Sequence, residues 1–486
     1  MDETRDAEAI LRRVARDTNL LFAARPASVA RGTSHEPVAA RVDAMLRALG
    51  SLADAEGAPG SLTFAFDRLA PGTDPTGVPV LLDGRPLPDR GDAAGRIAFA
   101  AERMPVSAAI AAETDLAGLR VGVSMVLEPK TANLALLLRR AGAAVSVYAH
   151  PDETDAAVAD ALRVEGIPTT ADPALSGASE RAAAESFLRA GFDVLIDDGA
   201  HLIRLAHEID PAIPGAWIGA NEETTSGLTP LRRMAEAGLL RTPVMAVNDA
   251  AVKKRFDNRY GTGQSCALAI GDLLERAGGS VRDQPAVVVG YGPVGQGVAA
   301  CLAALGAAVR VAETDPVRAL EATHDGHGVA PLADAARGAL VVSATGAPGT
   351  IPAAIAERAA AVAVAGGIPG EVDEIPGPRT VVAPGVERLA SGALLLGGGG
   401  AVNLTAGEGN PIEIMDLSFA AQLTALAQLL RERPGPGVHA VSPEADDRVA
   451  RAALAARGLR IDRGSASAAP GSVDWRSPRY PSGRRA

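Results

Sequence analysis

Residues 286–297 read AVVVGYGPVGQG, and this stretch decides the fold of the second half of the chain. A short apolar run, 286–289, leads into Gly290-x-Gly292-x-x-Gly295, and an Ala-rich segment follows. In a strand–turn–helix unit, Gly290 allows a tight turn, Gly292 lets a pyrophosphate approach the backbone, and Gly295 lets the helix pack closely on the strand. The unpaired N–H groups at the start of that helix favour a bound phosphate. The pattern therefore predicts a dinucleotide site.

About twenty residues further on, a second apolar run ends at Glu313. A carboxylate at the tip of the strand after the glycine motif is placed to accept hydrogen bonds from both hydroxyls of the adenosine ribose. The same negative charge would repel a 2′-phosphate. Glu313 therefore predicts NAD rather than NADP as the cofactor.

The composition indicates a multidomain protein of a reducing compartment. A chain of 486 residues is expected to form two or three domains, and its net charge of −11 argues against a general nucleic-acid binder. Cys266 and Cys301 are the only cysteines, so neither a disulfide framework nor a metal site is expected. The N-terminus lacks the apolar core of a signal peptide, and no apolar run approaches the roughly 18 residues that span a bilayer. We expect a cytoplasmic protein without membrane or nucleic-acid partners.

An alternation of apolar runs and Ala/Leu/Arg-rich segments predicts an α/β fold with two doubly wound parallel (Rossmann-like) sheets. The expected strands are 119–127, 143–149, 192–198 and 242–249 in the first sheet, and 286–290, 308–314, 339–346, 360–367 and 380–385 in the second. A helix over 411–430 is expected to pack back on the first domain, leaving a cleft between the two.

This pattern divides the chain into four parts. They are an N-terminal extension (1–93), a substrate-binding domain (94–257 and 404–432), an NAD-binding domain (258–403), and a C-terminal helix and tail (433–486). Within the extension we expect two short amphipathic helices, about 5–17 and 38–53, and a turn-rich stretch over 58–90.

Four polar clusters follow predicted strands, at the edge where open α/β sheets bind ligands. They lie at 197–201, 221–226, 248–258 and Asn403. Each alone is typical of a helix cap, a turn or a solvated helix face. Lys253 and Asp257 are four residues apart, so on a helix an amine and a carboxylate can converge on one hydroxyl. This pair suits removal of a proton from a secondary alcohol as its hydride leaves to NAD.

In this order, the clusters resemble those of the S-adenosyl-L-homocysteine hydrolase family over about residues 94–432. The motifs that carry the resemblance are EPKTA (128–132), LIDDGAHL (195–202), NEETTSGL (221–228), VNDAAVKKRFDNRYG (247–261), VVVGYGPVGQG (287–297), VSATG (342–346) and AVNLTAGEGNPIEIMDLSFA (401–420). The resemblance implies one tightly held NAD per subunit, hinges near 258–262 and 403–406, and a homotetramer.

The resemblance also implies a staged reaction on a nucleoside. The 3′-hydroxyl is transiently oxidised to a ketone, which acidifies the 4′ C–H. The proton and the 5′ substituent then leave, water adds to the 4′,5′-ene, and the ketone is reduced again.

Carried over position by position, the resemblance gives each candidate site residue a role. Lys253 and Asp257 would serve the 3′-hydroxyl, and Asp198 would act at the 4′ and 5′ positions. The residues that would bind substrate are Glu128, Lys130, Glu223, Leu404, Glu408 and Asn410. Those that would hold NAD are Thr224, Thr225, Ser226, Asn258, Gly290, Gly292, Pro293, Val294, Gly295, Glu313, Thr345, Gly346, Asn403 and, from a tail that would reach the neighbouring subunit, Arg476 and Tyr480.

The active-site histidines of the family are missing. Val126, Gly367 and Asn410 occupy their positions, and one histidine is gained because His201 replaces a family aspartate. The stretch that helps hold the homocysteine end in the family becomes HPDETD at 150–155. A positioned general acid or base is worth about 10²–10⁴ in rate, so three losses predict impaired thioether hydrolysis.

The preferred hypothesis is a divergent member that keeps 3′-oxidation and eliminates a small 5′ group, for example dehydrating a nucleoside to a 4′,5′-ene. His201 or Glu408 would then protonate the departing hydroxyl. The alternatives are an ordinary S-adenosyl-L-homocysteine hydrolase, in which other groups or water replace the histidines, and a catalytically silent NAD-binding regulator. The retained Lys253 and Asp257 argue against the silent form, and the altered 150–155 stretch argues against the ordinary hydrolase.

Overall fold

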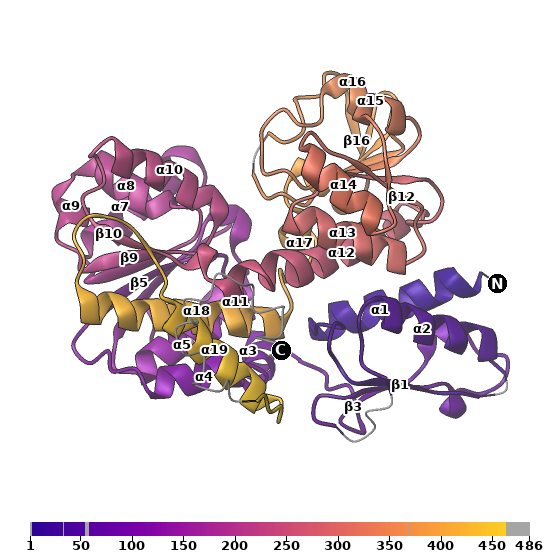
Figure 1. Ribbon diagram of the computed structural model, residues 1–486, viewed down its shortest axis with the longest axis horizontal. Helices are drawn as coiled ribbons and strands as arrows, with labels where there is room; N and C mark the ends of the chain where they lie inside the picture. Colours follow the sequence, from indigo (N-terminus) through magenta and orange to yellow (C-terminus); the bar gives the residue numbers. More distant parts are fainter. Residues whose placement is uncertain (1, 33, 54–57, 369, 463–486) are drawn as a thin grey trace, which may run out of the picture.

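The described residues, 2–32, 34–53, 58–368 and 370–462, form three β-sheets in the computed structural model (Figure 1). The indigo N-terminal module carries four strands, the magenta first domain seven and the orange second domain eight. The gold C-terminal helices lie against the first domain, so the chain crosses between the two large domains twice. The predicted α/β fold with two doubly wound sheets is confirmed.

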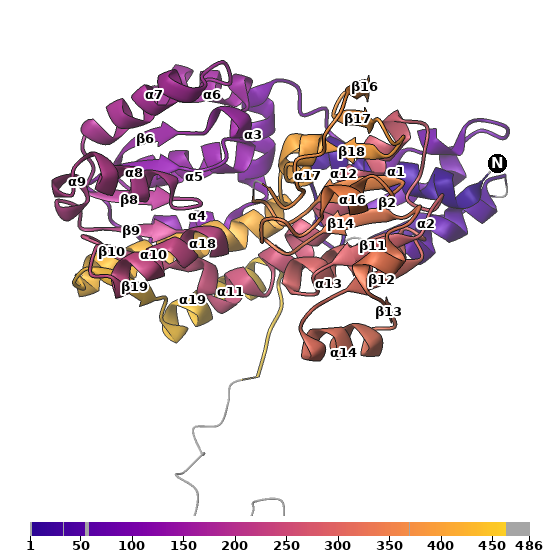
Figure 2. The ribbon, with the colours of Figure 1, turned by 90° about the horizontal axis from the view of Figure 1, so that it is seen from above.

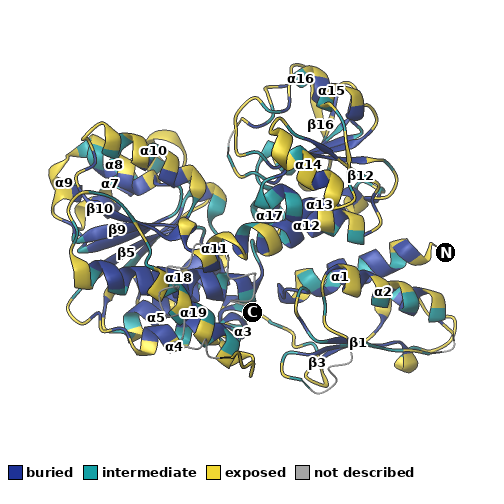
Figure 3. Ribbon diagram, in the orientation of Figure 1, coloured by how far each residue is buried: buried dark blue, intermediate teal, exposed yellow. Residues whose placement is uncertain are grey.

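Every strand of the first domain runs parallel to its neighbours. The spatial order is β19 (Gly437–Ala440), β10 (Pro243–Ala246), β9 (Gly219–Glu222), β8 (Val194–Asp197), β5 (Arg120–Ser124), β6 (Ala144–Tyr148) and β7 (Thr169–Thr170). Figure 3 shows the central strands of this sheet as buried, because helices cover both of its faces, whereas the edge strands β19 and β7 are partly exposed. The strand order reverses direction between β5 and β8, and such a switch point opens a crevice at the carboxyl ends of the strands.

The helices of the first domain come from both sides of the second domain in the sequence. They are α3 (Ala93–Glu102), α4 (Pro105–Ala112), α5 (Pro129–Arg140), α6 (Ala156–Val164), α7 (Gly177–Arg189), α8 (His201–Ile209), α9 (Ala212–Gly215), α10 (Thr225–Glu236), α11 (Ala251–Lys254), α18 (Ile412–Glu432) and α19 (Pro443–Ala456). The helix expected over 411–430 is α18, and it packs on this domain as expected.

Three strands of this sheet were not predicted. β7 is too short to leave an apolar run, and β9 ends in polar residues that are typical of a loop. Asn221 of β9 is nevertheless fully buried, because its amide donates to the Gln422 carbonyl of α18 at 2.9 Å. β19 pairs with β10, so the segment 433–456, which we expected to form a separate helix and tail, continues the first domain. This corrects the boundary at residue 432.

The second domain also has a parallel core. The spatial order is β13 (Gly328–Val329), β12 (Val309–Ala312), β11 (Ala286–Val289), β14 (Leu340–Ser343), β15 (Ala361–Val364), β18 (Leu394–Leu396), β17 (Val386–Leu389) and β16 (Arg379–Ala383). Its helices are α12 (Thr262–Arg276), α13 (Pro293–Ala304), α14 (Pro316–His324), α15 (Leu332–Ala335), α16 (Ala353–Ala356) and α17 (Val402–Thr405). The strand predicted at 380–385 is not parallel: it is β16, in an antiparallel hairpin with β17 at the sheet edge.

The N-terminal module contains two helices and a small sheet. Its elements are α1 (Glu3–Thr18), β1 (Ala27–Ala30), α2 (Glu36–Ala48), β2 (Leu62–Ala65), β3 (Val80–Leu82) and β4 (Arg85–Pro86). Both helices were predicted to within a few residues. The stretch 58–90 was expected to be rich in turns; besides turns it contains three strands of two to four residues each, which are too short to give a periodic pattern.

The module docks on the second domain through a buried ion-pair network, and Figure 2 shows it lying along that domain. Arg12 of α1 is only 3% exposed and binds Asp272 at 2.6 Å and Glu275 at 2.9 Å, both on α12. Glu8, one turn earlier, lies 3.3 Å from the same guanidinium. Burial raises the pKa of the Glu8 carboxyl, although Arg12 acts to lower it. Arg12 is therefore the cation that three carboxylates share at this docking surface.

The module also contacts both segments that connect the large domains. Gln264, at the start of α12, binds the backbone of Leu20 and Phe22. At the second crossing, the Asn19 amide donates to the Glu408 carbonyl at 3.1 Å, and the Leu21 N–H donates to Glu413 at 3.0 Å.

Replacing Arg12 by Ala should destabilise the fold by about 3–5 kcal/mol, because the buried Glu8 carboxylate loses its cation, whereas Asp272 keeps Arg16 at 3.3 Å. Urea unfolding followed by circular dichroism measures the loss. The matched control is Arg5→Ala on the same helix, whose pair with Asp283 at 3.1 Å is about half exposed. That change should cost about 0–1 kcal/mol, and equal losses for the two variants would contradict the network described above.

Candidate active site between the two domains

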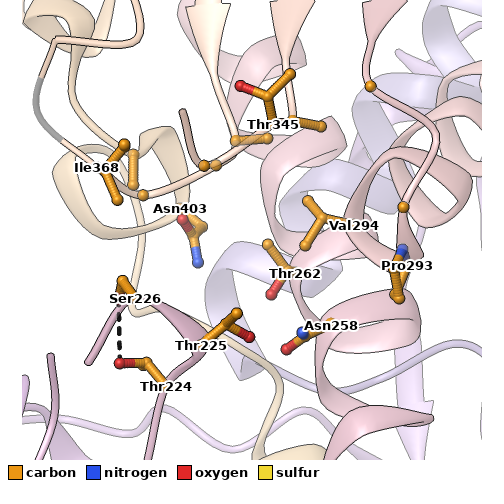
Figure 4. A pocket seen from close by; sticks show the side chains of 18 of the residues that line it. Thr224, Thr225, Ser226, Asn258, Thr262, Pro293, Val294, Thr345, Ile368 and Asn403 are labelled. Atoms are coloured by element: carbon orange, nitrogen blue, oxygen red, sulfur yellow. Dashed lines mark hydrogen bonds between the residues drawn. The ribbon is translucent and has the colours of Figure 1, made fainter. Parts of the chain in front are cut away.

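A cavity of about 1390 Å³ lies between the two large domains and is lined by both of them. Figure 4 looks into it: Thr224, Thr225 and Ser226 of the first domain lie on one side, and Val294 and Thr345 of the second domain on another. The predicted site residues that line the cavity are Glu128, Lys130, Asp198, His201, Glu223, Thr224, Thr225, Ser226, Lys253, Asp257, Asn258, Gly290, Gly292, Pro293, Val294, Glu313, Thr345, Gly346, Asn403, Leu404 and Asn410.

The glycine loop between β11 and α13 forms a cradle on the second-domain side. Gly290 has φ of +89°, which glycine adopts without strain. A Cβ on Gly292 would meet nothing closer than Arg318 at 3.7 Å, so the backbone there stays open to a ligand. A Cβ on Gly295 would lie 1.9 Å from the Gly290 carbonyl oxygen, so this glycine is needed for α13 to pack on β11. Gly295 itself lies behind the cavity wall.

Glu313 follows β12 beside the cradle, as the sequence predicted. Its Oε2 accepts the Tyr291 N–H at 2.6 Å, and its Oε1 accepts the N–H groups of Thr314 and Asp315. Burial acts to raise the pKa of Glu313, but these backbone donors outweigh it and hold the pKa below its ordinary value. The carboxylate is therefore ionised and fixed at the place where an adenosine ribose is expected. The open cradle and this fixed acid fit NAD.

Arg318 lines the same region and was not singled out from the sequence. It lies on α14, five residues after Glu313, and its guanidinium is the group nearest to a Cβ placed on Gly292. A cation at this position is suited to a phosphate in the glycine cradle. The spacing from Glu313 to the first turn of the next helix is the signal that could have found it.

A buried cluster of opposite charges lies on the first-domain side. The Lys253 ammonium contacts Asp257, one helical turn later, and lies 3.3 Å from Glu223. Burial acts to lower the pKa of Lys253, but Asp257 and Glu223 raise it above its ordinary value. Lys253 is therefore an ammonium at rest, and the group able to accept a proton is one of its carboxylate partners.

Long-range contacts position this cluster. The Gln422 amide of α18 donates to Glu223 at 2.6 Å. The Asn410 amide donates to Asp257 at 2.6 Å, and the Asn403 amide donates to the Asn410 carbonyl oxygen at 3.2 Å. Asn410, at one of the missing histidine positions, thus connects the Asp257 carboxylate to the second crossing.

The first crossing begins at the same carboxylate. Residues Asp257–Gly261 form a π-helical turn, and α12 starts directly after it. Irregular turns of this kind occur at functional sites in helices. The hinge expected over 258–262 lies on this turn.

A second acidic group lies where β5, β6 and β8 end. Asp198 follows β8, and Glu153, which the sequence analysis did not select, follows β6. Burial raises the pKa of Asp198 well above its ordinary value, and the negative charges of Glu153 and Glu223 raise it further. Burial also raises the pKa of Glu153. In the sequence, Glu153 is typical of a solvated turn. Only the fold, which brings it into the same cavity as Asp198, indicates a functional role.

His201 lies beside this acidic group, as predicted. His201 is the first residue of α8, and the centroid of its imidazole ring lies 5.7 Å from the centroid of the His150 ring. Partial burial lowers the pKa of His201, and the neighbouring His150 lowers it further. His201 is therefore a neutral imidazole and a poor proton donor at neutral pH.

Glu408 does not line the cavity, which corrects its assignment as a proton donor. Its carboxylate binds Arg90 at 2.6 Å and Arg96 at 3.0 Å. Burial acts to raise the pKa of Glu408, but Arg90, Lys130 and Arg96 lower it, so the group stays ionised. Its backbone carbonyl instead accepts a hydrogen bond from Lys130 at 2.8 Å, which holds Lys130 in place.

Lys130 and Glu128 line the cavity from the start of α5. Glu128 caps α5 by accepting the Lys130 N–H at 2.8 Å, and it also binds the Lys130 ammonium at 2.6 Å. Burial raises the pKa of Glu128. Arg476 and Tyr480, the two tail residues expected to reach a neighbouring NAD, lie outside the described residues, so their role stays a prediction.

Comparison with known proteins agrees with this geometry. The family model described as the NAD-binding domain of S-adenosyl-L-homocysteine hydrolase matches residues 259–376. An adenosylhomocysteinase from Thermotoga maritima is 38% identical, over 72% of this chain and 90% of its own. An S-inosyl-L-homocysteine hydrolase from Methanothermobacter thermautotrophicus is 36% identical, over 76% and 92%. The chain belongs to the adenosylhomocysteinase family. Its cofactor is NAD, held by the second domain.

The helices of the described segments include none that combines enough length and apolarity to cross a lipid bilayer.

Replacing Gly295 by Ala should weaken NAD retention about tenfold or more. The new methyl group collides with the Gly290 carbonyl, and overpacking of this kind costs about 1–3 kcal/mol. The NAD content of purified protein and a fluorescence titration with NAD measure the effect. Gly328→Ala in the same domain is the control, because its nearest neighbour would be Arg310 at 3.7 Å. Normal NAD binding by the Gly295 variant would contradict the cradle.

Proposed function

We propose that this adenosylhomocysteinase-family enzyme transiently oxidises the 3′-hydroxyl of a nucleoside and eliminates a small 5′ group to leave a 4′,5′-ene. The preferred reaction is dehydration of a 5′-hydroxymethyl group. The observation that carries the proposal is the distribution of charge along one cavity. A buried lysine–carboxylate cluster lies near the NAD cradle, and two carboxyls line the end where β5, β6 and β8 finish.

The lysine cluster supports the oxidation. NAD, when bound, supplies the hydride acceptor. Loss of hydride from a secondary alcohol also requires loss of the hydroxyl proton, and Asp257 is the carboxylate next to Lys253. Lys253, as an ammonium, donates a hydrogen bond to the same oxygen and stabilises the negative charge that develops there. Glu223, fixed by Gln422, suits a second ribose hydroxyl.

The acidic end supports elimination of a small neutral group rather than homocysteine. Homocysteine carries both an ammonium and a carboxylate: Glu153 and Asp198 would pair with the ammonium, but they offer no partner to the carboxylate. Asp155, on the same turn, is occupied because it caps α6 and binds Arg96 at 2.8 Å. A departing hydroxyl carries no such charge and needs only a proton.

Thioether hydrolysis remains the second candidate, because relatives that are 36–38% identical are named adenosylhomocysteinase or S-inosyl-L-homocysteine hydrolase. It requires water addition to the same ene. A silent regulatory role has less support, since the Lys253 cluster is intact. A cytoplasmic homotetramer, inferred from the sequence, stays a prediction.

Incubation of the purified holoenzyme with a 5′-hydroxyl nucleoside, and separately with S-adenosyl-L-homocysteine, tests the preferred reaction. We expect a nucleoside product that is one water lighter by mass spectrometry. Homocysteine release should be slower than dehydration by about 10²-fold or more, because the three histidines of the family are missing from this chain. Rapid formation of adenosine and homocysteine would instead identify an ordinary hydrolase, and no turnover of either compound would favour the silent form.

Replacing Lys253 by Met should reduce formation of enzyme-bound NADH on nucleoside addition by about 10²–10⁴-fold, because the group that binds the 3′ oxygen is lost. Ultraviolet absorbance of the bound cofactor measures this step. Thermal melting and NAD content show whether the variant is folded. Lys254→Met, on the exposed side of α11, is the control and should behave as wild type. Undiminished NADH formation in the Lys253 variant would refute the assigned role.

A further inference from the structure

One carboxyl in the cavity has no role in the reaction as described so far. Glu153 lines the cavity from the short 3₁₀ turn Pro151–Glu153, directly after β6. The turn is tied to the loop after β5, because the Leu127 N–H donates to the Glu153 carbonyl at 2.9 Å and Leu127 pairs with Thr154. The position of Glu153 is therefore fixed by backbone contacts and does not depend on a flexible loop.

The same contacts bring Glu153 and Asp198 to one edge of the sheet. β5 pairs in parallel with β6 on one side and with β8 on the other, so the residues that follow all three strands meet at this edge. Asp198 is held there by its own N–H, which donates to the Ser124 carbonyl at 2.9 Å. The ring centroids of His150 and His201, which follow β6 and β8, lie 5.7 Å apart. Both carboxyls are half-buried and line the cavity.

We propose that Glu153 and Asp198 act as an acid–base pair on one substrate: one carboxyl takes the proton from C4′, and the other gives its proton to the departing 5′ oxygen. Glu153 is then a catalytic residue of this chain. The inference rests on the function proposed above, since it assigns the proton donor that the elimination requires.

The charge environment keeps one proton on the pair. Burial raises the pKa of Asp198, the negative charges of Glu153, Glu223 and Asp197 raise it further, and Lys253 lowers it. Burial also raises the pKa of Glu153, while His150 lowers it and Asp152 raises it. Burial and like charge both disfavour the ionised form of a carboxyl, so this end of the site favours keeping one proton on the two groups.

The step balances in atoms and electrons. With a ketone at C3′, the ionised member of the pair takes the C4′ proton, and that electron pair forms the C4′=C5′ bond. The C5′–O bond breaks, and the protonated member gives its proton to the leaving oxygen, which departs as water. The pair ends with one proton, as it began, and reduction of the ketone returns the hydride. The other two groups considered for this role do not fit, because Glu408 is ion-paired and His201 is neutral.

The test compares two leaving groups in Glu153→Gln. A 5′-hydroxyl nucleoside needs a proton to depart, whereas a 5′-chloro-5′-deoxynucleoside releases chloride without one. In the variant, NADH formation and exchange of the 4′ hydrogen with D₂O should persist, because Asp198 remains as the base. Elimination of water should fall by about 10²–10⁴-fold, and elimination of chloride should stay within about threefold of wild type.

The pH profile gives a second readout. Wild-type dehydration should fall as pH rises and the pair loses its shared proton, whereas chloride elimination by the variant should show no such fall. The matched control is Asp152→Asn, which replaces an exposed carboxylate on the same turn by a carboxamide. This variant should keep both reactions. Equal loss of both eliminations in Glu153→Gln, or loss of neither, would overturn the pair. Absence of NADH formation and of ene product in wild type would overturn the function proposed above instead.

Discussion

The site depends on one ammonium group, that of Lys253, held between Asp257 and Glu223 where the first domain passes into the second. Each partner is fixed by an element distant in sequence: Gln422 of α18 binds Glu223, and Asn410 of the second crossing binds Asp257. Removing the charge would leave two buried carboxylates with no counter-ion, and such groups are costly to bury. The cluster therefore joins catalysis and domain architecture in one set of contacts.

The charged groups that line the cavity fall into two sets. Cationic Lys253 is matched by Asp257 and Glu223, whereas Asp198 and Glu153 form no ion pair within the described residues. In the proposed reaction, the first set stabilises an alkoxide that becomes a ketone, and the second holds a proton for a leaving group. Since Val126, Gly367 and Asn410 stand at the positions of the family's histidines in this chain, the proposal assigns this proton transfer to carboxyls alone.

The sequence predicted what local pattern encodes. The glycine motif, Glu313 and the parallel strands around them follow from apolar runs and spacing, and Lys253 and Asp257 follow from helical periodicity. It could not predict β9, whose buried Asn221 is explained only by Gln422 two hundred residues later. Glu153 was missed for a similar reason, because a turn reading HPDET is typical of solvated surface until the loop after β5 binds it. The ion pairs of Glu408 with Arg90 and Arg96 could not be predicted either, because they join residues more than 300 positions apart in the sequence.

The docking of the N-terminal module has a consequence for the turnover cycle. Leu20 and Phe22 bind Gln264 of the first crossing, and Leu21, between them, binds Glu413 of the second. The module thus binds both segments that connect the two large domains, and a large rotation of one domain relative to the other must break some of these hydrogen bonds. In the proposed reaction, such a restraint would slow the escape of product, but it would also lengthen the time for which a reactive keto intermediate is sheltered from bulk solvent.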